Sequence, residues 1–185
     1  MLPEISLNIL DVAQNSISAG SPLTEIIVDI DTKADTLTVC INDSGCGMDE
    51  QQVKAVIDPF YTTRKTRKIG LGVPFFKMAA ENTGGSFSIT SEKGVGTKVK
   101  AVFGLSHIDR MPLGDMTFTI HTIVTLNDDK DFIYSYTVDG NGYTLDTREF
   151  RKILGNAPLN TPDVSVFIKQ YLDENTAEIN NGAVF

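Results

Sequence analysis

Three short glycine-containing segments of this sequence combine residue types that could hold a nucleotide. In the first, "DSGCGM", Asp43 ends a strand-like alternating run and is followed by Gly45 and Gly47. A carboxylate at a strand end can accept a hydrogen bond from the exocyclic amine of a base, and glycine lets the backbone approach a flat ring. The segment therefore suits an adenine pocket, although the same pattern is typical of a turn between a strand and a helix.

The second segment has the composition of an anion site. Gly70, Leu71 and Gly72 stand directly before "VPFFKMAAEN", which predicts a helix, and backbone amides at a helix N-terminus bind phosphate. Just before them lie four of the sixteen basic residues, namely Arg64, Lys65, Arg67 and Lys68. Such a run is equally typical of a solvated basic loop. The neighbouring glycines favour the phosphate site.

A third glycine segment and a polar helix stripe accompany these two. Gly94, Gly96 and Thr97 suit the tip of a hairpin, where glycine adopts turn conformations, but this pattern is common. The first predicted helix is apolar except for a thin polar stripe at helical spacing, which indicates a polar partner. The stripe consists of Asn8, Asp11, Asn15 and Ser18.

The elements that position these segments alternate between helices and hairpins. Periodicity and breaker residues predict helices over 3–19, 49–57 and 74–83, and hairpins over 24–43 and 86–103. Residues 58–69 have no apolar periodicity and are expected to form a loop. This order predicts an α+β fold, a two-layer sandwich with helices on one face of a mixed, mainly antiparallel sheet.

Taken in this order, the motifs resemble those of the GHKL superfamily, the ATPases of the gyrase B, heat-shock chaperone, histidine kinase and MutL type. "LDVAQNSISAG" resembles its N box, "DPFYTTRK" its phenylalanine box and lid, and "DSGCGM", "GLGV" and "GVGTKV" its three glycine boxes. The resemblance covers about residues 4–104. It implies the Bergerat α/β sandwich, in agreement with the order of elements.

The resemblance also implies ATP and Mg²⁺ as ligands. Asn15 would bind Mg²⁺ through its amide oxygen, while the triphosphate supplies most other oxygens. Asp43 would accept the adenine amine. The base pocket would be shaped by Gly45, Gly47 and Thr97. The phosphate contacts would come from Arg64, Lys65, Lys68, Gly70, Leu71 and Gly72.

Asp11 lies one helical turn before Asn15, where ATP-hydrolysing members of the superfamily carry a glutamate that activates water. Aspartate is one methylene shorter, so it would act as a general base only if its water lies within hydrogen-bond distance. The alternative is an aspartate that orients Asn15 or the hydrated magnesium ion. Both interpretations remain open at this point.

Some of these motifs resemble one subgroup of the superfamily, and others resemble another. "QNSISAG" is closer to the MutL and gyrase type, whereas "DPFYTTRK" followed at once by "GLGV" resembles histidine kinases. The short spacing of 25 positions from Gly72 to Thr97 also resembles histidine kinases. Two departures stand against that subgroup: Val73 replaces a usual leucine, and Ser18 stands where a basic residue is frequent.

The chain's only histidines are His107 and His121, and a lone histidine in an apolar run is usually structural. We therefore expect a phospho-acceptor on a separate protein. Three interpretations follow: a stand-alone histidine-kinase-like module, an anti-sigma-factor-like serine kinase, and a nucleotide-gated protein-binding module or slow ATPase without kinase activity. In the third, closure of the lid, residues 58–69, over the γ-phosphate would change the surface shown to a partner.

The composition of the whole chain limits its partners. A formal net charge of −8 disfavours nucleic-acid backbones and anionic membranes. No apolar run approaches the roughly 18 residues needed to span a bilayer, and the first residues lack the basic lead-in of a secretory signal. Cys40 and Cys46 have no metal-site spacing. A cytoplasmic protein is the expectation.

The charge distribution suggests two units. Residues 1–114 carry 13 acids and 11 bases, whereas residues 115–185 carry 11 acids and 5 bases. We expect an ATP-binding domain over 1–106 and a small acidic α+β extension over 107–185, which could serve docking, dimerisation or packing against the sheet. Within the extension, residues 116–126 suit either a strand or a helix. The sequence leaves the oligomeric state open.

Overall fold

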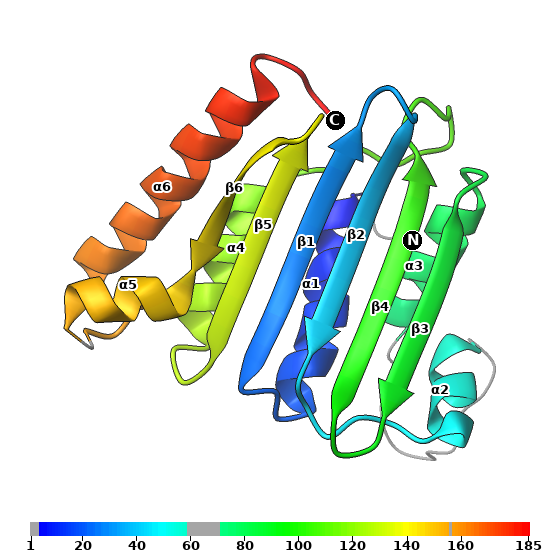
Figure 1. The fold of residues 1–185 in the computed structure, drawn as a ribbon, viewed down its shortest axis with the longest axis horizontal. Coiled ribbons are helices and arrows are strands. Elements are labelled where there is room, and N and C mark those ends of the chain that lie inside the picture. The colour runs from blue at the N-terminus through cyan, green and yellow to red at the C-terminus, as the bar shows by residue number, and fades with distance from the viewer. Residues whose placement is uncertain (1–3, 59–70, 156) are drawn as a thin grey trace.

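The computed structural model describes residues 4–58, 71–155 and 157–185. Its strands are β1 (Leu23–Asp31), β2 (Thr36–Asp43), β3 (Ser86–Glu92), β4 (Gly96–Gly104), β5 (Asp131–Val138) and β6 (Asn141–Asp146). They form one six-stranded sheet in the order β3-β4-β2-β1-β5-β6 (Figure 1). β1 and β5 run parallel, and the other neighbouring pairs are antiparallel. The predicted mixed, mainly antiparallel sheet is confirmed.

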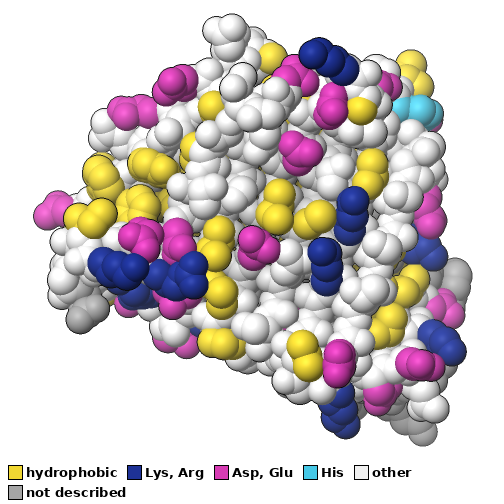
Figure 2. All heavy atoms as spheres, in the orientation of Figure 1, with side chains coloured by type: hydrophobic (Ala, Val, Ile, Leu, Met, Phe, Trp, Pro, Cys, Tyr) yellow, Lys and Arg dark blue, Asp and Glu magenta, His cyan; other side chains and the backbone are white. Residues whose placement is uncertain are grey.

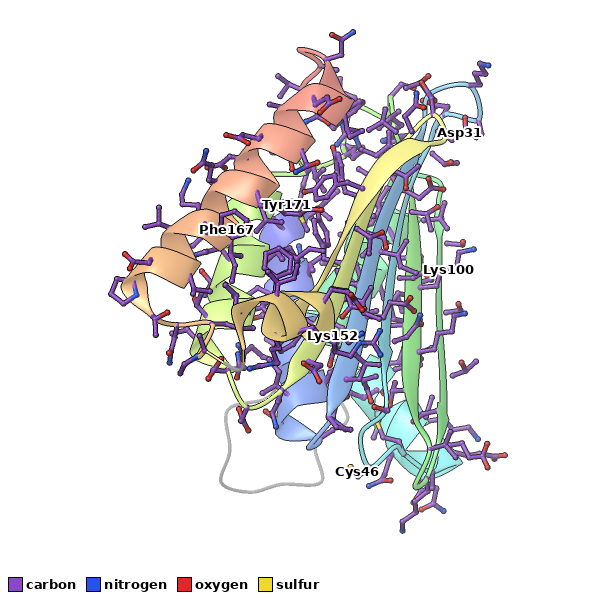
Figure 3. All side chains as sticks on the ribbon, turned by 60° about the vertical axis from the view of Figure 1, so that its left-hand side comes forward. Asp31, Cys46, Lys100, Lys152, Phe167 and Tyr171 are labelled. Carbon is purple, nitrogen blue, oxygen red and sulfur yellow. The ribbon has the colours of Figure 1, made fainter. Side chains whose placement is uncertain are left out.

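The helices gather on one side of this sheet. They are α1 (Ile5–Ser18), α2 (Glu50–Ile57), α3 (Gly72–Glu81), α4 (Met116–Leu126), α5 (Thr147–Leu154) and α6 (Pro162–Asn180). In Figure 1, α1, α3 and α4 lie behind the strands, and α5 and α6 lie at the β6 end. Figure 3 shows the sheet from nearer its edge, with no helix on its other face. Among the described residues, no helix has the length and apolar character needed to cross a membrane.

The first helix is held at both ends by its surroundings. Its buried apolar residues are Ile5, Ile9, Val12 and Ala13. The amides of Ile5 and Ser6 donate to the carbonyls of Pro112 and Leu113, so the connection after β4 satisfies two first-turn donors. Gly20, with φ +73°, then turns the chain into β1. This fixes the polar stripe of α1 relative to the sheet.

The ambiguous segment after the connection is the helix α4. The Asp115 carboxylate accepts a hydrogen bond from the Phe118 amide and caps the first turn. Met116, Ile120 and Ile123 face the core. The threonines between these apolar residues give the sequence its strand-like alternation, and some of them are also buried.

Residues 107–185 extend the same sheet and the same hydrophobic core as residues 4–104. β5 pairs with β1 from Leu23 to Ile30, and its Phe132, Tyr134 and Tyr136 are buried. The β5–β6 turn lies at Asp139 and Gly140, which both have positive φ. A domain boundary at 106/107 stays a prediction. The sheet continues across this position, because β5 and β6 belong to the same sheet as β1 to β4.

Candidate nucleotide site

The Asp43 carboxylate is fixed by three donors from three parts of the chain. Its Oδ2 accepts from the hydroxyl of Ser16 on α1 at 2.8 Å. Its Oδ1 accepts from the amides of Gly45 at 3.0 Å and Thr97 at 3.2 Å. A carboxylate offers about four lone-pair positions, so one acceptor position remains for a further donor. The geometry therefore suits the recognition of an amine.

A second small network joins the first and third glycine segments. The Ser91 side chain on β3 accepts from the Met48 amide at 2.8 Å, donates to the Gly96 carbonyl, and lies 2.8 Å from the Thr97 hydroxyl. The Gly94 amide donates to the Cys46 carbonyl at 2.8 Å. These bonds hold the loop after β2 against the β3–β4 hairpin.

The glycines serve this contact between two backbone segments. A Cβ built on Gly47, whose φ is +62°, would lie 1.9 Å from the Glu92 carbonyl oxygen. A Cβ on Gly96 would lie 1.9 Å from the Asp43 carbonyl oxygen. Both positions exclude any larger residue, because real atoms cannot approach so closely. The packing of two backbone segments therefore requires glycine at positions 47 and 96. This reason is separate from the expectation that glycine lets the backbone approach a base.

These elements enclose a pocket of about 100 Å³ between α1, the loop after β2, α3 and the strands β3 and β4. Its apolar walls come from Val12, Val56, Val73, Ile89 and Val99. Its polar groups come from Asn15, Ser16, Asp43 and Thr97. Apolar walls around a few oriented polar groups are typical of a binding site for a flat, partly polar ligand.

The start of α3 lies directly against the polar stripe of α1. A Cβ built on Gly72 would lie 2.9 Å from the Asp11 Cβ and 3.5 Å from its Oδ2. Asp11 and Asn15 are exposed, one turn apart, and their side chains make no hydrogen bond within the described part of the chain. A helix N-terminus, a carboxylate and an amide thus meet beside the pocket, where an anion could bind through amides and a cation through oxygens.

The structure brings most of the predicted site residues together. Asn15, Asp43, Gly47 and Thr97 line one pocket. Gly45 packs against Ala19 at the end of α1, and Leu71 precedes the first turn of α3. The predicted phosphate contacts Arg64, Lys65, Lys68 and Gly70 lie outside the described residues.

Sequence reasoning missed two serines that organise the site. Ser16 is buried among the apolar residues of α1, and Ser91 is half-buried at the end of β3. A buried hydroxyl requires a partner, so the position of Ser16 on the apolar side of a helix was a usable signal. Ser91 gave no such signal, because its partners Met48 and Gly96 belong to two separate turns.

Neither histidine lies in this pocket. His107 follows β4 at the end opposite Thr97, which at strand spacing is a separation of about 24 Å. His121 is half-buried on α4, and its Nε2 lies 2.9 Å from the Ser165 hydroxyl on α6. His121 therefore has a structural partner, as expected of a lone histidine in an apolar run.

Comparison with known proteins shows which family this sequence matches. The sequence model of the family described as "Histidine kinase-, DNA gyrase B-, and HSP90-like ATPase" matches residues 3–107. Sporulation kinase E of Bacillus subtilis is 33% identical over 96 residues, 52% of this chain and 13% of that protein. Sensor protein DegM of Bacillus sp. is 29% identical over 91 residues, 49% of this chain and 24% of that protein. The chain therefore spans a quarter or less of these relatives.

Solved structures show the same fold at low identity. The Aquifex aeolicus MutL ATPase domain complexed with ADP matches with a TM-score of 0.50 and 10% identity, over 99% of both chains. The N-terminal domain of a DNA repair protein matches with a TM-score of 0.51 and 14% identity, over 78% of this chain and 52% of that one. At these identities the likeness concerns the fold alone.

Proposed function

Because the chain belongs, through residues 3–107, to the family of histidine kinase-, DNA gyrase B-, and HSP90-like ATPases, we propose that it binds Mg·ATP at Asp43 and transfers the γ-phosphate to a separate protein. The observation that carries the nucleotide site is the fixed Asp43 carboxylate, with one free acceptor position facing a pocket with apolar walls. The kinase and sensor proteins among its relatives support the transfer.

Adenine recognition rests on Asp43. Its remaining lone pair accepts a hydrogen bond from the exocyclic amine, while the apolar walls contact the two faces of the ring. Guanine presents a carbonyl oxygen at the equivalent ring position, and an oxygen facing a carboxylate is repelled. The site therefore selects ATP and ADP over GTP.

The phosphate end rests on α1 and α3. The amides at the start of α3 bind phosphate oxygens, and the Asn15 amide oxygen is a ligand of the hard type that Mg²⁺ prefers. Within the described residues, no group of three or more His, Cys, Asp or Glu could hold a metal by itself. These residues fit Mg²⁺ that arrives with the triphosphate, where it would neutralise charge on the transferring phosphate.

Hydrolysis is a second candidate activity, because Asp11 lies beside the start of α3. There the carboxylate is one turn from Asn15 and able to accept a proton from a water that attacks the terminal phosphate. A transfer to protein and a slow hydrolysis can share this site, since they differ in the nucleophile. We propose an acceptor on another protein, which is supported by the structural partner of His121 and by the distance of His107 from the pocket.

The test of this function follows the γ-phosphate. Purified protein is incubated with Mg²⁺ and γ-labelled ATP in a lysate of its own source, beside Asp43→Asn and the surface control Asp173→Asn. We expect label on a second polypeptide with the chain and the control, and none with Asp43→Asn. Loss of the label in acid indicates phosphohistidine, and retention indicates phosphoserine.

Two outcomes contradict transfer to protein. Free phosphate without labelled protein would assign the chain to hydrolysis, and nucleotide binding without any turnover would assign it to nucleotide-gated binding.

A further inference from the structure

Among the residues that the structure describes, no helix covers the central strands on the face of the sheet opposite the helices. Figure 3 shows Lys100 pointing away from the helix layer on this bare face. The side chains at its centre are short or apolar and only half-buried, and they include Ile27, Cys40, Val102 and Ile133. A half-buried apolar sheet face is a surface on which another sheet can pack.

The charged side chains around the centre of this face are separated by strand. Lys98 and Lys100 lie on β4, Glu25 and Asp29 lie on β1, and β2 runs between them. All four charges act on the Cys40 thiol at the centre of β2, so they surround one point. Figure 2 views this face and shows basic side chains directly to the right of the central apolar group and acidic side chains above it and to its lower left, with further basic and acidic side chains near the left edge.

The two charged strands do not neutralise each other within the chain. In the described part of the protein, Lys98, Lys100, Glu25 and Asp29 form no ion pair. β4 and β1 are two strand spacings apart, about 9.6 Å, with the short side chains of β2 between them. Each chain therefore presents one basic strand and one acidic strand to a partner.

We propose that this face binds a second copy of the chain, sheet on sheet, about a two-fold axis that runs along β2. Registers across β2 align Lys98 with Asn42 and Glu25, and Lys100 with Cys40 and Ile27. The two-fold rotation about this axis exchanges the positions of β4 and β1. It places Lys98 of each copy over Glu25 of the other and Lys100 between Glu25 and Asp29. The face is complementary to itself, as an isologous contact requires.

The size of the face sets the strength of the dimer. Rotation about β2 exchanges β4 with β1 and β3 with β5, and these five strands present about 600 Å² per copy at the usual strand spacing and rise. About 1,200 Å² in total lies at the lower limit for specific interfaces. The dimer is therefore reversible, with a dissociation constant of roughly 1–100 µM, and it weakens with salt because ion pairs contribute to it.

Charge reversal tests the contact directly. The basic-strand variant is Lys98→Glu/Lys100→Glu, and the acidic-strand variant is Glu25→Lys/Asp29→Lys. Sedimentation velocity from about 1 to 200 µM should show a dimer for the unaltered chain and monomers for each variant alone. An equimolar mixture of the two variants should dimerise again, because every contact then joins opposite charges. A control with the same change in charge, Lys152→Glu/Lys169→Glu on α5 and α6, should dimerise like the unaltered chain.

Cross-linking tests the position of the axis. In a Cys46→Ser background, Cys40 is the only cysteine, and the proposed axis places it opposite its own copy with the sheets about 10 Å apart. A bis-maleimide with a two-carbon spacer should join two chains, and the basic-strand variant should abolish this product. A monomeric chain at 200 µM, variants that dimerise as the unaltered chain does, or a mixture that stays monomeric would each overturn the proposal. The restored mixture also shows that both variants are folded.

Discussion

The Ser16 hydroxyl donates a 2.8 Å hydrogen bond to Oδ2 of Asp43, which joins the first helix to the end of β2. The two residues lie 27 positions apart, and Ser16 is almost fully buried. The bond fixes the orientation of the carboxylate, so that its free lone pair faces the pocket. The proposed recognition of adenine by Asp43 would therefore depend on Ser16, a residue of α1.

Replacement of this serine tests that dependence. Ser16→Ala should weaken ADP binding about 5- to 10-fold, because one hydrogen bond that orients the carboxylate contributes on the order of 1 kcal/mol. Isothermal titration calorimetry measures the dissociation constant. Ser18→Ala, an exposed position on the same helix, should leave it unchanged. Equal affinities of Ser16→Ala and Ser18→Ala would show that the amides of Gly45 and Thr97 suffice to orient Asp43.

Two variants can separate the effect of close packing at Gly47 on stability from the effect of its positive φ. Gly47→Ala and Gly94→Ala both place alanine at positive φ, but only the Gly47 Cβ meets an atom, the Glu92 carbonyl oxygen at 1.9 Å. Gly94→Ala should cost about 1 kcal/mol in the free energy of unfolding, and Gly47→Ala at least about 2 kcal/mol more. Urea denaturation compares them. Equal costs would mean that the loop moves away from Glu92 without penalty.

Replacement of Asp11 should slow ATP hydrolysis and leave the affinity for ADP nearly unchanged. Asp11→Asn keeps the size of the side chain and removes its ability to take a proton, so any ATP hydrolysis should fall about 100-fold or more. The affinity for ADP should change less than about 2-fold. Gln14→Ala, exposed on the same helix, is the control for both measurements. An unchanged hydrolysis rate in Asp11→Asn would assign this residue to the orientation of Asn15.

Two tyrosines, the buried Tyr136 and the half-buried Tyr143, predict sensitivity to alkali. Burial raises the pKa of Tyr136 and of Tyr143 to about 12 each, from an ordinary value of 10.0. The unfolded chain therefore loses these protons first, so their stabilisation is complete below pH 10 and is lost as the pH rises towards 12. Urea denaturation between pH 9 and 12 should show this decline in the free energy of unfolding. In Tyr136→Phe, the slope of the free energy of unfolding against pH should correspond to about one proton fewer. A parallel decline in Tyr136→Phe would refute the role of this tyrosine.

The C-terminal region should be required for folding. A chain ended at residue 106 would expose one edge of β1, together with the buried side of α1 that contacts α4. We expect this truncated chain to lack a cooperative unfolding transition in circular dichroism. A truncated chain that unfolds cooperatively and binds ADP with the affinity of the full chain would instead support a domain boundary at 106/107.

Local signals predicted most of the fold, because caps, glycines and periodicity act over a few residues. The helix that begins at Glu50 has the capping box of Asp49 and Gln52, and α5 begins at the side-chain cap of Asp146. The parallel pairing of β1 with β5 could not be predicted in this way. Its partners, such as Ile26 and Tyr134, are more than a hundred positions apart, and no turn between them sets the register.

The site was predictable as far as its residues match ordered motifs. Asn15, Asp43 and Thr97 come from three such motifs and meet in one pocket. The partners from distant segments were not predictable, because nothing near Asp43 in the sequence identifies Ser16 as its donor, and nothing near Met48 identifies Ser91 as its acceptor.

The most direct test of the central claim is the calorimetric titration of ADP into the unaltered chain, Asp43→Asn and the control Asp173→Asn. In the proposed function Asp43 accepts the hydrogen bond of the adenine amine, so Asp43→Asn should lose at least about 100-fold in affinity, since an amide group facing the base leaves polar groups unpaired. Asp173 lies on α6 and pairs with Lys169, and its variant should bind like the unaltered chain. Full affinity in Asp43→Asn, or an unaltered chain that binds GDP as tightly as ADP, would contradict the account.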